Sequence, residues 1–137
     1  MKKTLSLILA LCMLIALAAC GKTDASSLWD GAAYTQDALV GSGNKSVQLE
    51  VKAGDKSVTI TIKTDREMLS DALLDNKLVD ADAGSAGLFI NSVIGMSADY
   101  DKDGAYWGFF QNGEYALNGV ESTPISDGDH YELVYTK

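Results

Sequence analysis

The segment VQLEVKAGDKSVTITIK, residues 47–63, has the clearest strand pattern in this chain. Val47, Leu49 and Val51 alternate with polar residues, and the same alternation resumes at Val58 after a short polar turn. A period of two is typical of β-strands that bury one face and leave the other in solvent. The stretch therefore predicts a β-hairpin with one face on the hydrophobic core.

A change of period after this hairpin predicts one short helix packed on the sheet. Thr64 and Glu67 have the spacing of a capping box, and apolar residues then recur at helical intervals as far as Asn76. Residues 79–87 are acidic and Gly-rich, which predicts a loop. Residues 88–94 are apolar on both faces, so we expect a strand at the centre of the sheet.

The N-terminus has the layout of a lipoprotein signal peptide. Lys2 and Lys3 form a positively charged region, a mostly apolar run follows, and small residues precede Cys20. The sequence LAACG resembles the bacterial lipobox, in which the cysteine is lipidated and becomes the first residue of the mature chain. We therefore expect residues 1–19 to be removed and the protein to be lipid-anchored on the extracytoplasmic face of the cell membrane. The alternative is an ordinary secretion signal that ends in a chance cysteine.

Charge and cysteine content exclude several classes of function. Loss of Lys2 and Lys3 from the 11 basic residues leaves nine against 19 acidic residues, a net charge of −10. Such a surface repels nucleic acid and anionic headgroups, so the lipid on Cys20 is the expected membrane contact. Cys12 lies in the segment that is removed, so the mature chain has no partner for a disulfide.

Residues 20–45 form a lipid-anchored tether ahead of the domain, which we place at residues 46–137. The tether begins with small polar residues, as a flexible linker does. It then contains Trp29 and Tyr34, which free linkers rarely carry. We therefore expect residues 29–40 to dock on the domain, with an edge strand as one form of docking.

The segment DYDKDG partly matches a calcium-binding loop. Asp99, Asp101 and Asp103 followed by Gly104 match the start of a calcium-binding loop. The position that should supply a bidentate Glu is Phe110, and a strand rather than a helix is expected to follow. We therefore favour a solvated turn between two strands and predict no metal site.

The following segment, AYWGFFQNGEYA, predicts an aromatic hairpin. Asn112-Gly113 is the strongest short-range signal for a two-residue hairpin turn, and residues 114–116 form the returning strand. A final strand, residues 131–136, alternates Tyr131, Leu133 and Tyr135 with more polar residues.

The two faces of the aromatic strand have different expected roles. With a period of two, Trp107 and Phe109 share one face, and Tyr106 and Phe110 share the other. One face must be core, and the other can meet a ligand, with Gly108 leaving room for a flat molecule. Packing in the core remains the alternative for each ring, because a small domain needs large residues to fill its interior. The predicted ligand-binding residues are Tyr106, Trp107, Phe109, Gln111, Asn112 and Tyr115.

Three segments together resemble a known family: WDGAAYTQDALVGSGNKSVQLEV, TIKTDREMLSDAL and ADYDKDGAYWGFFQNGEYALNGVESTPISDGDHYELVYT. The resemblance is to the transcobalamin-like C-terminal domain of bacterial, mainly Gram-positive, surface lipoproteins. It rests on the Tyr106-Trp107 pair, the Asn112-Gly113 turn, Gly119 and the turn at residues 127–129.

The resemblance implies an α+β fold with a β-grasp-like mixed sheet and one packed helix. It also implies binding of a corrinoid such as cobalamin, or of another flat ligand. Eukaryotic cobalamin carriers close such a domain over the corrin against a large helical domain. We therefore expect weak capture here, or a partner that completes the site.

Catalysis is not expected from this sequence. His130 is the single histidine, and without a cysteine or a second histidine it makes neither a zinc site nor a Cys-His dyad. Two hypotheses remain, and neither requires a cofactor. The protein is a small-molecule-binding module that passes its ligand to a membrane importer, or it is an adhesion or assembly domain that binds another envelope protein.

Overall fold

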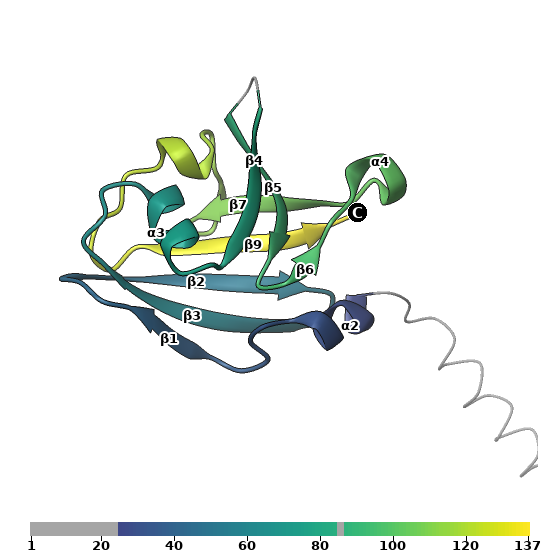
Figure 1. Ribbon diagram of the computed structural model, residues 1–137, viewed down its shortest axis with the longest axis horizontal. Helices are drawn as coiled ribbons and strands as arrows, with labels where there is room; N and C mark the ends of the chain where they lie inside the picture. The colour runs from purple at the N-terminus through teal and green to yellow at the C-terminus, as the bar shows by residue number, and fades with distance from the viewer. Residues whose placement is uncertain (1–24, 85–86) are drawn as a thin grey trace, which may run out of the picture.

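The computed structural model describes residues 25–84 and 87–137, and a six-stranded sheet is its largest part (Figure 1). The strand order is β1-β3-β2-β9-β7-β8. The strands are β1 Ala38–Gly41, β2 Lys45–Ala53, β3 Lys56–Thr64, β7 Tyr106–Gln111, β8 Glu114–Tyr115 and β9 His130–Thr136. β1 pairs parallel with β3 and β9 pairs parallel with β2, whereas the other neighbours are antiparallel. The sheet is therefore mixed, as the predicted α+β fold requires.

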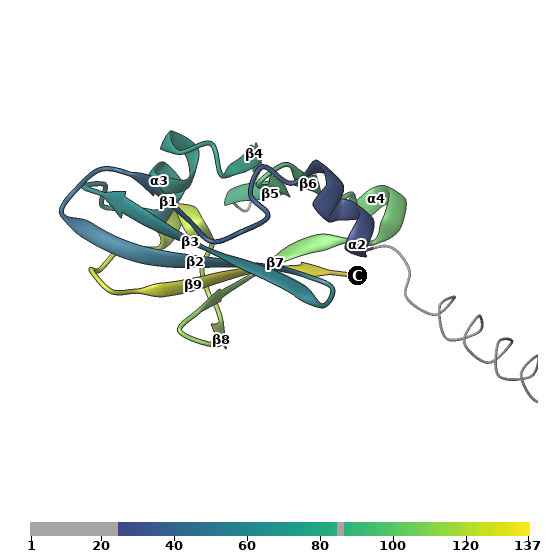
Figure 2. The ribbon, with the colours of Figure 1, turned by 90° about the horizontal axis from the view of Figure 1, so that it is seen from below.

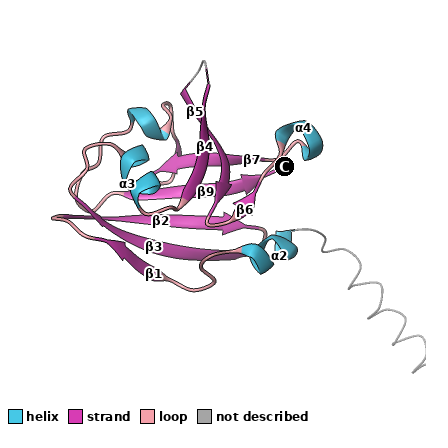
Figure 3. Cartoon of the chain, in the orientation of Figure 1, coloured by secondary structure: helices cyan, strands magenta, loops and turns pink. Residues whose placement is uncertain are grey.

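A second layer covers one face of this sheet. It contains the main helix α3, Leu69–Asp75, and a three-stranded antiparallel sheet in the order β4-β5-β6 (Figure 2). The three strands are β4 Val79–Gly84, β5 Gly87–Val93 and β6 Met96–Ser97. The shorter helices are α2 Ala25–Leu28, η1 Trp29–Gly31, α4 Tyr100–Asp103 and η2 Val120–Ser122 (Figure 3).

The hydrophobic core lies between the two layers. The inward residues of the first hairpin are fully or almost fully buried, among them Val47, Leu49, Ile60 and Ile62. Full burial of each such side chain contributes about 1.5–3 kcal/mol. The predicted hairpin and its buried face are therefore confirmed.

The segment from Trp29 to Val40 packs on the domain, as expected. Trp29 is buried, and its indole Nε1 donates to the carbonyl oxygen of Ala53 at 3.0 Å. β1 then lies in parallel beside β3 and forms an edge of the sheet. Much of the predicted tether is thus part of the folded structure.

The predicted capping box at the start of the helix is wrong. Thr64 ends β3, where its Oγ1 accepts a hydrogen bond from the backbone N–H of Arg66 at 3.0 Å. The N-cap of α3 is Met68, and the N–H of Leu69 donates to the carbonyl oxygen of Thr123 at 2.9 Å. The helix starts later because a distant loop supplies the acceptor that a side-chain cap would provide.

The predicted acidic loop and central strand also need correction. Most of the loop is strand β4, in which Asp80 and Asp82 face outward and accept hydrogen bonds from Ser92 and Asn91 of β5. β5 does occupy a sheet centre, but that of the three-stranded sheet. A small strand of alternating Asp and Ala has low β-propensity, so pairing with β5 rather than local sequence decides its structure.

The calcium-like segment forms a helical turn rather than a hairpin turn. Asp99 is the N-cap of α4, and its Oδ1 accepts from the backbone N–H of Lys102 at 3.1 Å. Gly104 ends the helix with φ of 69°. The segment connects β6 to β7, which belong to different sheets, so a tight hairpin would not span the connection.

Several predictions fall outside the described residues. These are the signal peptide at residues 1–19, the lipidation site at Cys20 and the first residues of the tether. Within the part of the chain that the structure describes, no helix is long and apolar enough to cross a membrane.

Candidate functional site

An apolar groove opens between the two layers of the fold. We name it the aromatic groove; it has a volume of about 390 Å³. It is lined by Leu88, Phe89, Ile90, Tyr100, Tyr106, Trp107, Phe109, Gly119 and Val120. β5 and β7 form its two walls, while α4 and η2 supply the remaining contacts. The groove therefore exists only because the two sheets pack together.

Exposed rings stand at the edge of the aromatic groove. Phe89 is 49% exposed and Tyr100 is 61% exposed, although both are large apolar side chains. Tyr100 also contacts Tyr106 edge to face, with ring centroids 6.4 Å apart. Aromatic surface left in contact with water at the mouth of a groove is typical of a ligand-binding site.

Trp107 lines the groove and carries a polar group that has no partner in the described part of the chain. Its side chain is 7% exposed and packs edge to face against Tyr135, with centroids 5.6 Å apart. Its buried indole Nε1 has no hydrogen-bond partner among the described residues. A buried N–H without a partner costs about 1–3 kcal/mol, and an acceptor that reached this group would recover that free energy.

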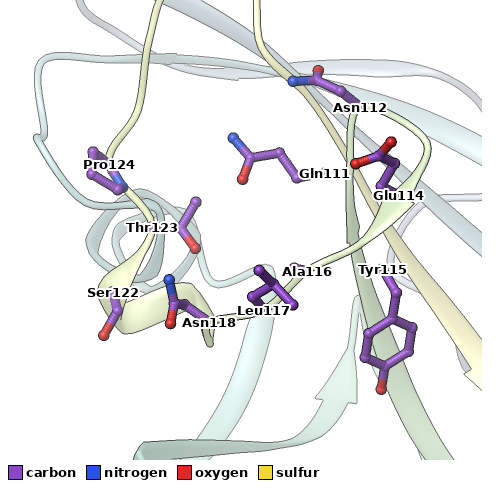
Figure 4. Close-up of a pocket in the computed structure, with 10 residues that line it drawn as sticks. All are labelled: Gln111, Asn112, Glu114, Tyr115, Ala116, Leu117, Asn118, Ser122, Thr123 and Pro124. Carbon is purple, nitrogen blue, oxygen red and sulfur yellow. The ribbon is translucent and has the colours of Figure 1, made fainter.

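The predicted binding residues divide between two cavities. Tyr106, Trp107 and Phe109 line the aromatic groove. Gln111, Asn112 and Tyr115 line a separate hollow of about 550 Å³, the hairpin cavity, between the β7–β8 hairpin and residues 116–124 (Figure 4). The sequence places all six on one hairpin, but the structure does not bring them to one site.

The hairpin cavity is more polar than the aromatic groove. Gln111 extends across its opening toward Thr123, whereas the ring of Tyr115 points away (Figure 4). The predicted two-residue turn is confirmed, because Asn112 and Gly113 both have positive φ angles, 52° and 85°. Such angles are those of the hairpin turn that matches strand twist.

The role predicted for Gly108 is wrong. A Cβ atom at this position would lie 3.4 Å from the ring of Phe110 and 3.4 Å from Oγ1 of Thr136. Phe110 itself contacts Tyr115 edge to face, with centroids 5.1 Å apart. The space beside Gly108 is therefore filled by the protein's own aromatic ring rather than left for a ligand. Trp107 and Phe109 share one face of the strand, as predicted, and the structure shows that this face is the core side.

Several lining residues of the groove could not be found from the sequence. Leu88, Phe89 and Ile90 come from β5, whose sequence predicts a place at the centre of the sheet. The signal in the sequence is the apolar character of both faces of this strand. In the structure its first residues are only partly buried or exposed. Apolar residues on a half-exposed strand indicate a surface that packs against a ligand or partner.

A family model described as a domain of unknown function, DUF4430, matches residues 67–137, which is just over half of the chain. The chain belongs to the DUF4430 family. The match includes β7, β9 and all nine residues of the aromatic groove. A search of curated proteins gave no match.

Two solved structures resemble this DUF4430 protein. One is a protein from Ruminococcus gnavus ATCC 29149, described as a candidate metal binding protein; it is 33% identical, with a TM-score of 0.65. That match covers 69% of this chain and 98% of the other. The second is haptocorrin in complex with Cbi, at 23% identity and a TM-score of 0.52, covering 68% of this chain and 25% of haptocorrin. The fold is therefore shared with part of haptocorrin.

Proposed function

We propose that this protein is a lipid-anchored, extracytoplasmic small-molecule-binding protein that holds a flat, partly apolar ligand in the aromatic groove. One observation carries the proposal: Trp107 lines an apolar groove, and its buried indole N–H has no hydrogen-bond partner among the described residues. Small-molecule sites commonly combine apolar walls with a few polar groups that fix the orientation of the ligand. A ligand with a ring system and a carbonyl acceptor fits this combination.

A corrinoid such as cobalamin is the ligand class that we favour. The fold shared with haptocorrin, which is crystallised with Cbi, supports this choice. A groove of about 390 Å³ can hold only part of so large a molecule. Aromatic contacts add about 0.5–1.5 kcal/mol per ring pair beyond area burial. We therefore propose weak capture, with an importer or another envelope protein covering the rest of the ligand.

We also propose that the protein binds its ligand without transforming it. The nine residues that line the aromatic groove include no carboxylate, imidazole or amine. General acid–base catalysis most often uses such groups, within hydrogen-bond reach of the reacting atoms. The lining therefore supports binding rather than catalysis.

An adhesion or assembly role is the second candidate function. Tyr115, the last residue of β8, is 62% exposed, and Leu117, two residues later, is 99% exposed. Exposed apolar side chains that lie together are typical of protein-binding surfaces. In this alternative the partner is another envelope protein.

The test uses cobalamin and two single-tryptophan variants. Isothermal titration should detect binding to the unmodified chain, and cobalamin should quench fluorescence in Trp29→Phe, which keeps Trp107, more than in Trp107→Phe. Trp107→Phe should also weaken binding about five-fold, because it removes one hydrogen bond of about 1 kcal/mol while keeping an aromatic ring.

Leu117→Ser is the matched control for the second candidate. This exposed residue does not line the aromatic groove, so cobalamin affinity should stay unchanged. Absence of cobalamin binding, or equal affinity in Trp107→Phe, would argue against the aromatic groove as a corrinoid site. Loss of binding to envelope proteins in Leu117→Ser alone would favour the adhesion role.

A further inference from the structure

The face of the six-stranded sheet that points away from the second layer carries a cluster of polar residues. β2 and β9 are parallel neighbours, and their register sets Gln48 beside His130 and Glu50 beside Glu132. The imidazole Nε2 of His130 lies 3.7 Å from Oε1 of Glu50 and 3.7 Å from Oε1 of Glu132. The three side chains thus converge on one point above the sheet, which is distinct from the aromatic groove.

We propose that Glu50, His130 and Glu132 bind a divalent transition metal ion, with Zn²⁺ as the best fit. One potential ligand atom from each residue lies within 4.8 Å of the other two. Zinc bonds to nitrogen and oxygen are about 2.0–2.2 Å long, so ligand atoms of a tetrahedral site are roughly 3.4 Å apart. The two separations of 3.7 Å therefore need only small side-chain movements, and water would take the fourth position.

A neighbouring side chain orients the histidine for this role. Nδ1 of His130 lies 3.4 Å from Oε1 of Gln48, and this oxygen can accept a hydrogen bond from an Nδ1–H group. The proton held on Nδ1 leaves the lone pair of Nε2 directed at the two carboxylates. Metal-binding histidines usually have such a second hydrogen bond, which fixes the tautomer and the ring orientation.

The strands hold the two carboxylates close together on a partly buried surface. The side chains of Glu50 and Glu132 are 21% and 16% exposed, and His130 is 35% exposed. Lys52 reduces the repulsion between them: its Nζ lies 3.1 Å from Oε2 of Glu132 and 3.6 Å from Oε1 of Glu50. Lys52 contacts the Glu132 oxygen that does not face His130, so it competes with a metal mainly at Glu50.

The ligand set favours a particular class of ion. An imidazole nitrogen with two carboxylate oxygens suits Zn²⁺ and neighbouring transition metals, whereas Ca²⁺ requires six to eight oxygen ligands. A single histidine can bind zinc when carboxylate ligands lie beside it. The register of β2 against β9 supplies them.

The test measures Zn²⁺ binding to the full, tag-free chain with both cysteines, Cys12 and Cys20, replaced by Ser so that no thiol competes. Isothermal titration should give one Zn²⁺ per chain. Glu50→Gln, Glu132→Gln and His130→Gln should each weaken binding at least ten-fold, as loss of a metal ligand does, and excess Ca²⁺ should not compete. Lys52→Met should strengthen binding because it removes the competing ammonium group.

Two controls keep the result decisive if a variant folds poorly. Glu114→Gln changes an exposed carboxylate on β8 and should leave Zn²⁺ binding unchanged. The sequence has one histidine, so the imidazole signals in an NMR spectrum belong to His130. These signals should shift when Zn²⁺ is added and broaden when Co²⁺ is added. Unchanged imidazole signals at saturating metal, or undiminished affinity in folded Glu132→Gln, would overturn the proposal.

Discussion

Tyr131 illustrates how one residue connects the last strand to the loop before it. Its ring is fully buried in the core, and its hydroxyl donates to Oδ2 of Asp129 at 2.8 Å. The same carboxylate oxygen accepts from the backbone N–H of Ser126 at 2.9 Å. Burial, together with the nearby Asp129 carboxylate, raises the pKa of Tyr131 above its ordinary value. The folded state therefore favours the neutral phenol.

Tyr131→Phe should destabilise the protein by about 1 kcal/mol, the contribution of one hydrogen bond. The loss is modest because Asp129 keeps its bond to Ser126. A raised folded pKa gives a contribution that is fully present below the unfolded pKa of about 10 and is lost as the pH rises above it. Urea unfolding at about pH 8 and about pH 10.5 measures this loss. The unfolding free energy of the original protein should be lower at the higher pH, and this decrease should be smaller in Tyr131→Phe.

Tyr115→Phe is the matched control, because this tyrosine is 62% exposed. It should alter neither the unfolding free energy nor its decrease with pH. An unchanged stability of Tyr131→Phe would contradict the hydrogen bond to Asp129.

At the scale of elements, β1 depends on a glycine at its end. Gly41 has φ of 77°, and a Cβ atom there would lie 2.3 Å from the carbonyl oxygen of Lys63 in β3. The close approach of these two backbones lets β1 extend the sheet in parallel beside β3. A side chain at this position would therefore strain the strand in two ways.

Gly41→Ala should be more destabilising than Gly128→Ala. Both glycines have positive φ, 77° and 87°, but a Cβ atom at Gly128 would have nothing within 4 Å. The shared backbone strain costs about 1–2 kcal/mol. The contact with Lys63 should add about 1–3 kcal/mol, as overpacking does.

Urea unfolding of the two variants measures this difference directly. The quantity of interest is the gap between their unfolding free energies. Equal costs would contradict the close packing of β1 on β3.

At the scale of the whole molecule, the six-stranded sheet separates two candidate sites. The aromatic groove lies on the side of the second layer, and the Glu50–His130–Glu132 cluster lies on the opposite face. β9 contributes to both sides, since Leu133 is in the core while Glu132 is in the cluster. Binding at the two sites can therefore be measured separately.

The proposed lipid anchor is also tested on the whole molecule. We expect Cys20→Ser to move the protein from the membrane fraction to the soluble fraction, because it removes the residue that would carry the acyl chains. Stable anchoring needs two or more such chains. Cys12→Ser, in the predicted signal peptide, should leave the distribution unchanged. Mass spectrometry of the mature N-terminus identifies the modification, and an unmodified Cys20 would contradict the proposal.

Local sequence pattern was a good guide to some elements and a poor guide to others. The first hairpin and the Asn112-Gly113 turn were predictable because alternation and turn chemistry act between near neighbours. β4 was not predictable, since Asp80 and Asp82 resemble loop residues until β5 pairs with them. The helix start was missed for the same reason: its acceptor is Thr123, on a distant loop.

Sequence alone predicts which side chains share a face of each strand, because side-chain direction alternates along any β-strand. It placed Trp107 and Phe109 on one face, and Glu50 on the wet face of its hairpin. Which strands are neighbours depends on the packing of the whole chain. β2 and β9 are about 80 residues apart, and their parallel register brings Glu50 to Glu132 and His130. No local pattern encodes such a pairing, because it depends on how the two layers bury their apolar faces together.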